Sequence, residues 1–310
     1  MEYLFLLIGI AALVVGGECL VRSAVGLNMK FKLSPLLIGT TVVSFGTSAP
    51  ELIVSINAVL DGNSQIAVGN VIGSNVANIG LVLGITILLR SLIISRSKYM
   101  WSWSLMLLAS LMFFLFSMDY VISAFEGLIL LLGLFVFIWF SIRRELRPGH
   151  NNDFIEGVNN KKISTAWIIG YFIIGGLGLY IGSELLVDNA VIIAQNLGVS
   201  DFIIAISVVA LGTSLPELAT SIIAISKGEN SISIGNLLGS NIFNIFAVLG
   251  VSSLINPLTI DPFLIQIDLP IMLGFVIMLG LFMFLGKKMG VIEGIALILA
   301  YVAYIAFGFL

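Results

Sequence analysis

Two glutamates stand inside long apolar stretches of this chain, each within nearly the same seven residues. The first stretch, "GTSAPEL", covers residues 46–52, and the second, "GTSLPEL", covers residues 212–218. A charge at the centre of an apolar membrane helix costs roughly 2.5–3.5 kcal/mol. No basic residue lies close in sequence to Glu51 or Glu217. A cation from outside the protein is the simplest counter-charge, and the alternative is a protonated glutamate hydrogen-bonded between helices.

Oxygen-bearing side chains recur around both glutamates, at the three- and four-residue spacing of one helical face. The same spacing continues in the apolar stretch that follows each glutamate. These residues are Ser44, Thr47, Ser48 and Ser55 with Asn70, Ser74 and Asn78, and then Thr213, Ser214 and Ser221 with Asn236, Ser240 and Asn244, Ala210 standing where the first copy has Ser44. Carboxylate, hydroxyl and amide oxygens suit Na⁺ and Ca²⁺, whereas zinc or copper would favour imidazole or thiolate ligands.

A proline precedes each glutamate and adds a further source of oxygen. Pro50 and Pro216 each lack a backbone N–H and clash with the carbonyl one turn earlier, near Gly46 and Gly212. Carbonyl oxygens freed in this way can bind a cation where irregular backbone lines a cavity. A kink that serves packing alone is the alternative interpretation.

The elements that position these residues are membrane helices. Of the 310 residues, 59% are hydrophobic and 10% are charged, and the mean hydropathy is +1.15. The apolar stretches are continuous and do not alternate with polar residues, which favours helices over the strands of a barrel. We expect an all-α membrane protein with ten transmembrane helices, at 3–24, 35–60, 66–89, 100–118, 120–142, 165–196, 201–226, 231–255, 264–285 and 290–309.

The basic residues predict the orientation of these helices. All fourteen Lys and Arg residues follow odd-numbered spans. By the positive-inside rule those loops are cytoplasmic, and both termini are extracellular. Because the basic residues are spread along one membrane face, they indicate topology and no nucleic-acid partner. We expect a multi-pass cell-membrane protein that needs no obligatory protein partner.

The sequence contains an internal repeat. Residue n matches residue n+166 without gaps from about residue 16 to residue 84, so that "GNVIGSNVANI" (69–79) corresponds to "GNLLGSNIFNI" (235–245). We expect a first five-helix repeat at 1–142, a cytoplasmic linker at 143–164 and a second repeat at 165–310. Five spans are an odd number, so the second repeat is inverted, as in many secondary transporters with sites near the midplane. Glu18 and Glu184 also correspond, and we interpret them as interfacial.

The chain resembles the cation/calcium exchanger superfamily, and within it the sodium/calcium exchanger family. "GTSAPEL…GNVIGSNVANI" and "GTSLPEL…GNLLGSNIFNI" are similar to the two α-repeats of that family. The resemblance implies ten helices in two inverted halves. It also implies calcium ligands at Glu51 and Glu217, sodium ligands at Thr47, Ser48, Thr213 and Ser214, further ligands at Ser74, Ser240 and Asn78, and carbonyl ligands at Ser44 and Ala210.

Asn244 departs from part of the family. Some prokaryotic members and the potassium-dependent exchangers carry aspartate there, whereas potassium-independent animal exchangers carry asparagine, so the resemblance implies exchange without K⁺. We therefore expect an electrogenic antiporter that exchanges Na⁺ for Ca²⁺ by alternating access, with no cofactor besides the transported ions. A Ca²⁺/H⁺ exchanger of the same superfamily and a cation channel are the alternatives. The sequence shows no nucleophile-and-base pair and no cofactor loop, so we do not expect this protein to be an enzyme.

Overall fold

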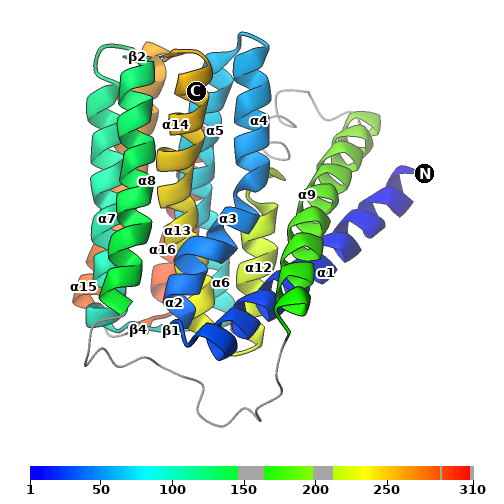
Figure 1. Cartoon of the computed structure of the whole chain (residues 1–310). Coiled ribbons are helices and arrows are strands. Elements are labelled where there is room, and N and C mark those ends of the chain that lie inside the picture. The colour runs from blue at the N-terminus through cyan, green and yellow to red at the C-terminus, as the bar shows by residue number, and fades with distance from the viewer. Residues whose placement is uncertain (146–163, 198–211, 287, 308–310) are drawn as a thin grey trace. The chain divides into compact units, whose positions relative to one another are not determined.

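The computed structural model describes residues 1–145, 164–197, 212–286 and 288–307, and these residues form helices joined by short loops. Four two-residue strands are the other regular elements of this part of the chain (Figure 1). Segments marked η are π-helical turns that continue an α-helix. The elements are α1 (Glu2–Phe31), α2 (Pro35–Ile38), η1 (Gly39–Val43), α3 (Ser44–Thr47), α4 (Ala49–Leu60), α5 (Ser64–Ala77), η2 (Asn78–Leu83), α6 (Gly84–Leu89), β1 (Leu92–Ile93), α7 (Arg96–Phe116), β2 (Val121–Ile122), α8 (Ala124–Glu145), α9 (Thr165–Asn196), α12 (Leu215–Ser226), α13 (Asn230–Phe243), η4 (Asn244–Leu249), α14 (Gly250–Ile255), β3 (Leu258–Thr259), η5 (Leu264–Asp268), α15 (Leu269–Leu285), β4 (Lys288–Met289) and α16 (Val291–Phe307).

The predicted helical class is confirmed. Among the described residues, seven helices are long and apolar enough to cross a membrane, and a bent pair, Pro35–Thr47 with Ala49–Leu60, makes an eighth. The predicted spans 201–226 and 290–309 correspond to the shorter apolar helices α12 and α16. Because residues 198–211 lie outside the described residues, the count of ten stays a prediction.

The chain divides into two compact units. Unit 1 comprises Met1–Ala49 with Phe140–Asn236, and unit 2 comprises Pro50–Trp139 with Leu237–Leu310. Each unit therefore takes segments from both halves of the sequence.

In unit 1, helices α1 and α9 run antiparallel and side by side (Figure 1). Their backbones touch at glycines: a Cβ atom on Gly16 would lie 2.6 Å from the Leu179 nitrogen, and one on Gly175 would lie 2.8 Å from the Leu20 nitrogen. Small residues allow such close packing of membrane helices. The glycines of these apolar spans are therefore required by the packing of α1 on α9.

A second glycine contact in unit 1 brings the segment α2–η1–α3 onto the start of α13. A Cβ atom on Gly39 would lie 2.7 Å from the Ile232 carbonyl oxygen, and one on Gly235 would lie 2.8 Å from the Leu36 carbonyl oxygen. The surrounding core is apolar and consists of Leu13, Leu20, Val21, Ala24, Ile38, Val43, Leu179, Ala224 and Ile232. This contact places the polar residues of α3 beside those of α13.

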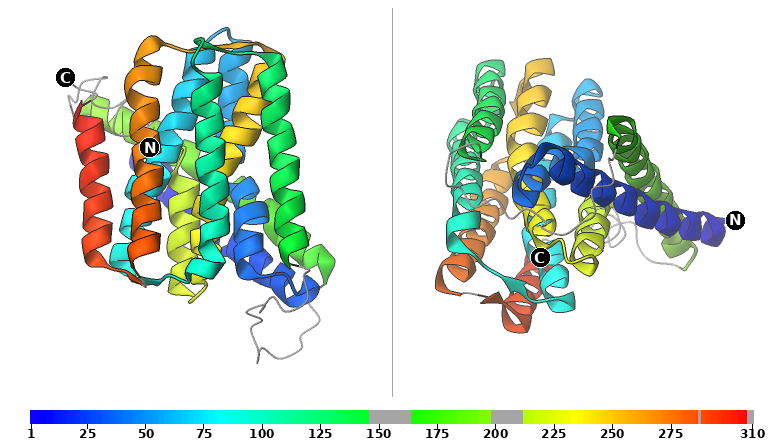
Figure 2. Two further views of the ribbon diagram at one scale, coloured as in Figure 1. Left: turned by 90° about the vertical axis from the view of Figure 1, so that its left-hand side faces the viewer. Right: turned by 60° about the horizontal axis from the view of Figure 1, so that its bottom comes forward.

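In unit 2, two antiparallel strand pairs join loops that are distant in sequence. β1 pairs with β4, with Leu92 opposite Met289, and β2 pairs with β3, with Val121 opposite Thr259. The pairs lie at opposite ends of the helices of this unit (Figures 1 and 2). Helices α7 and α15 of this unit are joined by a hydrogen bond, in which Trp103 Nε1 of α7 donates to the Val276 carbonyl oxygen of α15 at 2.8 Å.

Candidate cation-binding site

Both copies of the glutamate motif place the acid in the first turn of a helix, directly after a backbone break. Ser48 (φ −90°, ψ 5°) separates α3 from α4, and Ser214 (φ −87°, ψ 2°) precedes α12. Pro50 and Pro216 are the second residues of α4 and α12, where a missing backbone N–H removes no intrahelical bond. The helices therefore begin at the same repeat positions, Glu51 and Glu217 each lying one residue after its proline.

The two carboxyl groups are completely buried, with 0% of either residue exposed. The positive end of a helix dipole favours a negative charge by typically about 0.3–1 kcal/mol. This is less than the roughly 2.5–3.5 kcal/mol that a charge costs at the centre of an apolar span. The helix N-termini therefore offset only part of the cost of burying these carboxyl groups.

In unit 1, hydroxyl groups from the first motif contact polar groups from the second half of the chain. Ser48 Oγ donates to Glu217 Oε1 at 3.0 Å. Thr47 Oγ1 donates to Asn236 Oδ1 at 2.9 Å, and Ser44 Oγ donates to the Asn236 carbonyl oxygen at 3.0 Å. All five residues are completely buried. We call these five residues the unit 1 group.

The remaining predicted ligands of the second motif lie near Glu217 in sequence, and the structure describes two of them. Ser214 is buried, and its hydroxyl makes no hydrogen bond to any described residue. Thr213 is half-buried, and Ala210 lies outside the described residues. The Gly212 carbonyl oxygen, predicted to be freed by Pro216, accepts a hydrogen bond from Ser183 Oγ at 2.6 Å. Ser183 was not among the predicted site residues.

Unit 2 holds the other predicted ligands, all of them buried. We call Glu51, Ser74, Asn78, Ser240 and Asn244 the unit 2 group. The Glu51 carbonyl oxygen accepts from Asn70 Nδ2 at 3.3 Å, and the same amide donates to Ser55 Oγ at 3.0 Å.

The amide–hydroxyl contact next to Glu51 has a counterpart in unit 1. There Asn236 Nδ2 lies 3.5 Å from Ser221 Oγ, and these residues are 166 positions after Asn70 and Ser55. The sequence repeat is therefore accompanied by the same side-chain pairing in both copies.

Asn78 and Asn244 begin the π-helical turns η2 and η4 at equivalent positions of the two repeats. π-Helical turns are rare and frequently occur at functional sites. Asn244 Nδ2 donates to Asn75 Oδ1 at 3.2 Å, whereas the Asn244 oxygen and both polar atoms of the Asn78 amide bond to no described residue. Buried amide oxygens of this kind are suitable cation ligands.

Asn236 was predicted to lie on a polar face but not to be a ligand, and Asn75 was not among the predicted site residues. Asn236 contacts Thr47, Ser44 and Ser221, so it organises the unit 1 group. Asn75 contacts Asn244 and donates weakly, at 3.4 Å, to the Asn241 carbonyl oxygen. The signal for both was present, because each asparagine recurs 166 residues away within the "GN…GSN" motif.

Each unit therefore contains one carboxylate together with hydroxyl and amide oxygens. Among the described residues, no three His, Cys, Asp or Glu side chains gather where they could hold a metal ion. The hydroxyl and amide groups must then complete any cation coordination shell. Such neutral oxygen ligands suit hard cations that are bound reversibly.

The comparisons with known proteins agree with this chemistry. The family model described as "Sodium/calcium exchanger protein" matches residues 1–143 and 167–310. The chain is 31% identical over 351 residues to the sodium/calcium exchanger MaX1 of Methanosarcina acetivorans, covering 98% of this chain and 97% of the relative. It is 36% identical over 274 residues to the inner membrane protein YrbG of Escherichia coli, covering 86% and 84%.

A solved structure is similar over almost the whole chain. The sodium-calcium exchanger NCX_Mj, in crystals soaked with Na⁺ and Ca²⁺, superposes with a TM-score of 0.83 at 30% identity, covering 98% of this chain and 97% of that one. The apolar helices, the duplicated acidic motifs and these matches lead to one conclusion. The chain is a multi-pass membrane protein that belongs to the sodium/calcium exchanger family.

Proposed function

We propose that the protein is a secondary antiporter that exchanges Na⁺ for Ca²⁺ by alternating access. The observation that carries this proposal is the buried hydrogen bond from Ser48 to Glu217, which joins a predicted sodium ligand to a predicted calcium ligand. A carboxylate that binds Ca²⁺ must be neutralised again when Ca²⁺ leaves. Na⁺ bound by the neighbouring hydroxyl and carboxylate oxygens supplies that charge. Competition for the same oxygens then couples the two ions.

The ligands of the transported ions are, in this proposal, the unit 1 and unit 2 groups together with Thr213, Ser214 and the backbone of Ala210. Glu51 and Glu217 carry the negative charge that Ca²⁺ requires. The neutral oxygens outnumber those that one Ca²⁺ uses, which favours several Na⁺ ions as the exchanged species. Asn244 supplies an oxygen without charge, and in this proposal exchange proceeds without K⁺. With more than two Na⁺ exchanged for each Ca²⁺, every cycle moves net charge.

The proposed topology has ten helices in two inverted five-helix repeats, 1–142 and 165–310, joined by a cytoplasmic linker. The strand pairs of unit 2 support the assignment of the loops to the two sides of the membrane. Arg90 lies just before β1, Lys98 lies in the first turn of α7 that follows β1, and Lys288 lies in β4, which pairs with β1. The loops with Asp119 and Asp261 meet at the other end through β2 and β3. Basic loops thus share one end of this unit, which we assign to the cytoplasm.

Ion flux into proteoliposomes tests the proposal. An outward Na⁺ gradient should drive Ca²⁺ uptake, and a pH gradient of equal size should not. Uptake that follows the pH gradient and ignores Na⁺ would place the protein with the Ca²⁺/H⁺ exchangers. Downhill Ca²⁺ flux that needs neither counter-ion would indicate a channel.

A further inference from the structure

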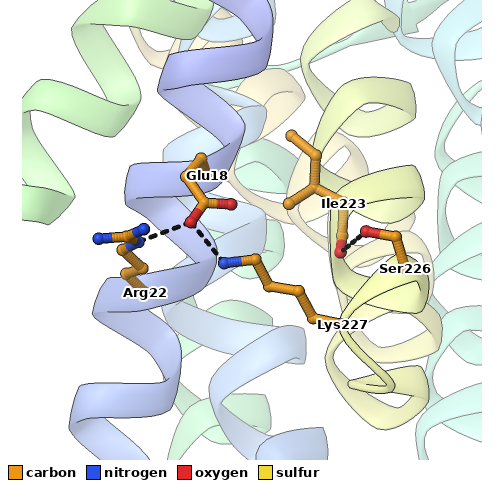
Figure 3. A network of polar contacts seen from close by, with 5 residues as sticks. All are labelled: Glu18, Arg22, Ile223, Ser226 and Lys227. Atoms are coloured by element: carbon orange, nitrogen blue, oxygen red, sulfur yellow. Dashed lines mark hydrogen bonds and ion pairs between the residues drawn. The ribbon is translucent and has the colours of Figure 1, made fainter.

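A second polar cluster, which contains neither of the motif glutamates, lines a cavity in unit 1. Figure 3 shows its centre, where Glu18 of α1 lies between Arg22 and Lys227. Glu18 Oε1 accepts from Arg22 Nε at 2.6 Å and from Lys227 Nζ at 2.5 Å. The cavity has a volume of about 600 Å³ and lies between α1, the start of α9 and the end of α12. The residues used below are Val21, Arg22, Trp167, Tyr171, Lys227 and Glu229, all of which line it.

The two basic side chains retain donors for a ligand. A guanidinium carries five N–H donors and an ammonium carries three. Arg22 uses donors on Glu18 and on Tyr171, and Lys227 uses one on Glu18. Both side chains are partly exposed, at 55% and 34%. A phosphate group entering the cavity would meet two cations that have free N–H groups.

The same cavity also offers groups that bind a cation. Glu229 is half-buried, and burial raises the pKa of its carboxyl group while Lys227 acts in the opposite direction. The rings of Trp167 and Tyr171 lie together, with centroids 5.8 Å apart. A cavity lined by a carboxylate and by aromatic rings is a suitable environment for an ammonium group. With Glu18 and Glu229 ionised, the acids and bases of this cluster balance, so a ligand with both charges fits better than a simple anion.

The cavity lies where two apolar helices end, the level at which lipid headgroups meet membrane helices. It is bordered by the first residues of α9, which begins at Thr165, and by the end of α12, which finishes at Ser226. Trp167 is 64% exposed at this helix end, the position in which tryptophan commonly marks the membrane interface. Val21 supplies an apolar wall that suits the start of an acyl chain. These features favour a membrane lipid over a soluble solute.

We propose that this cavity binds the headgroup of an ethanolamine phospholipid, with its phosphate on Arg22 and Lys227 and its ammonium group on Glu229 and the Trp167 and Tyr171 rings. The lipid would bridge α1, α9 and the end of α12. This assignment is independent of which ions the protein exchanges.

Fluorescence quenching by lipids with brominated acyl chains tests the proposal. The protein is reconstituted in phosphatidylcholine vesicles that contain brominated phosphatidylethanolamine or brominated phosphatidylglycerol, and the signal of Trp167 is the part of the quenching that disappears in Trp167→Phe. We expect Trp167 to be quenched at a roughly two- to fivefold lower fraction of the ethanolamine lipid, about the effect of one partly exposed ion pair. Glycerophosphoethanolamine in solution should not reverse this preference.

Three variants assign the contacts. Glu229→Gln should remove the preference for ethanolamine over glycerol headgroups, because only the ammonium contact is lost. Lys227→Gln should weaken the binding of both lipids, and Lys227→Arg should restore it. Arg90→Gln removes a basic residue that does not line the cavity, so the binding of both lipids should be unchanged in this variant.

Several results would overturn the assignment. One is equal quenching by the two lipids in the parent protein. Another is an unchanged preference in Glu229→Gln, or the same loss in Arg90→Gln. Displacement by soluble glycerophosphoethanolamine would identify a soluble solute as the occupant in place of a lipid.

Discussion

Ser48 Oγ donates a hydrogen bond to Glu217 Oε1 across 3.0 Å, although the two residues are 169 positions apart in sequence. Both are completely buried. Ser48 belongs to the first acidic motif and Glu217 to the second, so unit 1 joins a hydroxyl of one repeat to the carboxylate of the other. A hydroxyl oxygen and a carboxyl oxygen held at this distance can both contact one bound cation.

Replacing either glutamate by glutamine should abolish Ca²⁺ exchange. Glu51→Gln and Glu217→Gln preserve the size of the side chain but remove a negative charge that balances Ca²⁺. A hydrogen bond or ion contact to a charged group contributes about 1.5–3 kcal/mol, so the loss of one of two anionic ligands should lower Ca²⁺ flux by at least roughly ten- to hundredfold. Flux of ⁴⁵Ca²⁺ into proteoliposomes measures the effect.

The matched control for these variants is Glu184→Gln. Glu184 lies exposed on α9, where it accepts from Tyr180, and its neutralisation should leave exchange close to normal. Near-normal flux in Glu51→Gln or Glu217→Gln, with correctly inserted protein, would refute the ligand assignment.

Removing the hydroxyl of Ser48 should weaken cation binding without unfolding the protein. Ser48→Ala deletes a donor to Glu217 and a predicted sodium ligand, so we expect the apparent affinity for Na⁺ to fall by roughly tenfold or more. Ser48→Thr retains the hydroxyl and should retain most of the affinity. Ser226→Ala is the control, because Ser226 is exposed and donates to the backbone of its own helix. An unchanged Na⁺ dependence in Ser48→Ala would show that this hydroxyl binds no transported ion.

The sequence predicts the helices and the acidic motifs better than it predicts the side-chain contacts. Continuous apolar runs require backbone hydrogen bonds within each segment, which explains why hydropathy located the spans. Pro50 and Pro216 likewise indicated the breaks before α4 and α12, because proline suits only the first turn of a helix. These features depend on local residues alone.

The π-helical turns and the asparagine contacts were not predicted. The turns at Asn78 and Asn244 insert an extra residue within runs whose apolar pattern shows no interruption, so hydropathy does not reveal them. The Thr47–Asn236 contact depends on the close approach of Gly39 to α13, and a single sequence does not specify which glycines meet. The repeat offset was the only signal available for such pairs.

The two ends of unit 2 should face opposite sides of the membrane. On a Cys19→Ser background, which removes the single cysteine, we expect Lys98→Cys to react with an impermeant maleimide only from the cytoplasm. Asp119→Cys should react only from outside, since it lies in the loop that ends in β2. Labelling of both from one side would contradict the proposed topology.

Asn244 should make exchange independent of K⁺. Its amide oxygen is buried and bonds to no described residue, and it offers a cation no charge. Wild-type Ca²⁺ flux should therefore be equal with and without K⁺. Asn244→Asp adds a third acid and should change the apparent affinity for cations, whereas Asn75→Asp, on the residue that accepts from Asn244, serves as the comparison. A requirement of the wild-type protein for K⁺ would contradict the proposal.

The final prediction separates Na⁺ coupling from H⁺ coupling. A proton-coupled exchanger needs carboxylates that accept protons when Ca²⁺ leaves, and hydroxyl groups contribute little to that step. Thr47 donates to Asn236 and lies one residue before Ser48, the donor to Glu217, so its oxygen stands within a group that suits Na⁺. Thr47→Val preserves the shape of the side chain and removes that oxygen. We expect it to weaken the Na⁺ dependence of exchange by roughly two- to tenfold, as for the loss of one neutral hydrogen-bonding ligand, while Ca²⁺ binding changes less.

If more than two Na⁺ exchange for one Ca²⁺, net charge crosses the membrane, and the potential contributes about 2.3 kcal/mol per charge per 100 mV. Ca²⁺ uptake driven by an outward Na⁺ gradient should then carry a current and respond to an imposed potential. Electroneutral uptake that follows a pH gradient, and that is unaffected by Thr47→Val, would instead support proton coupling.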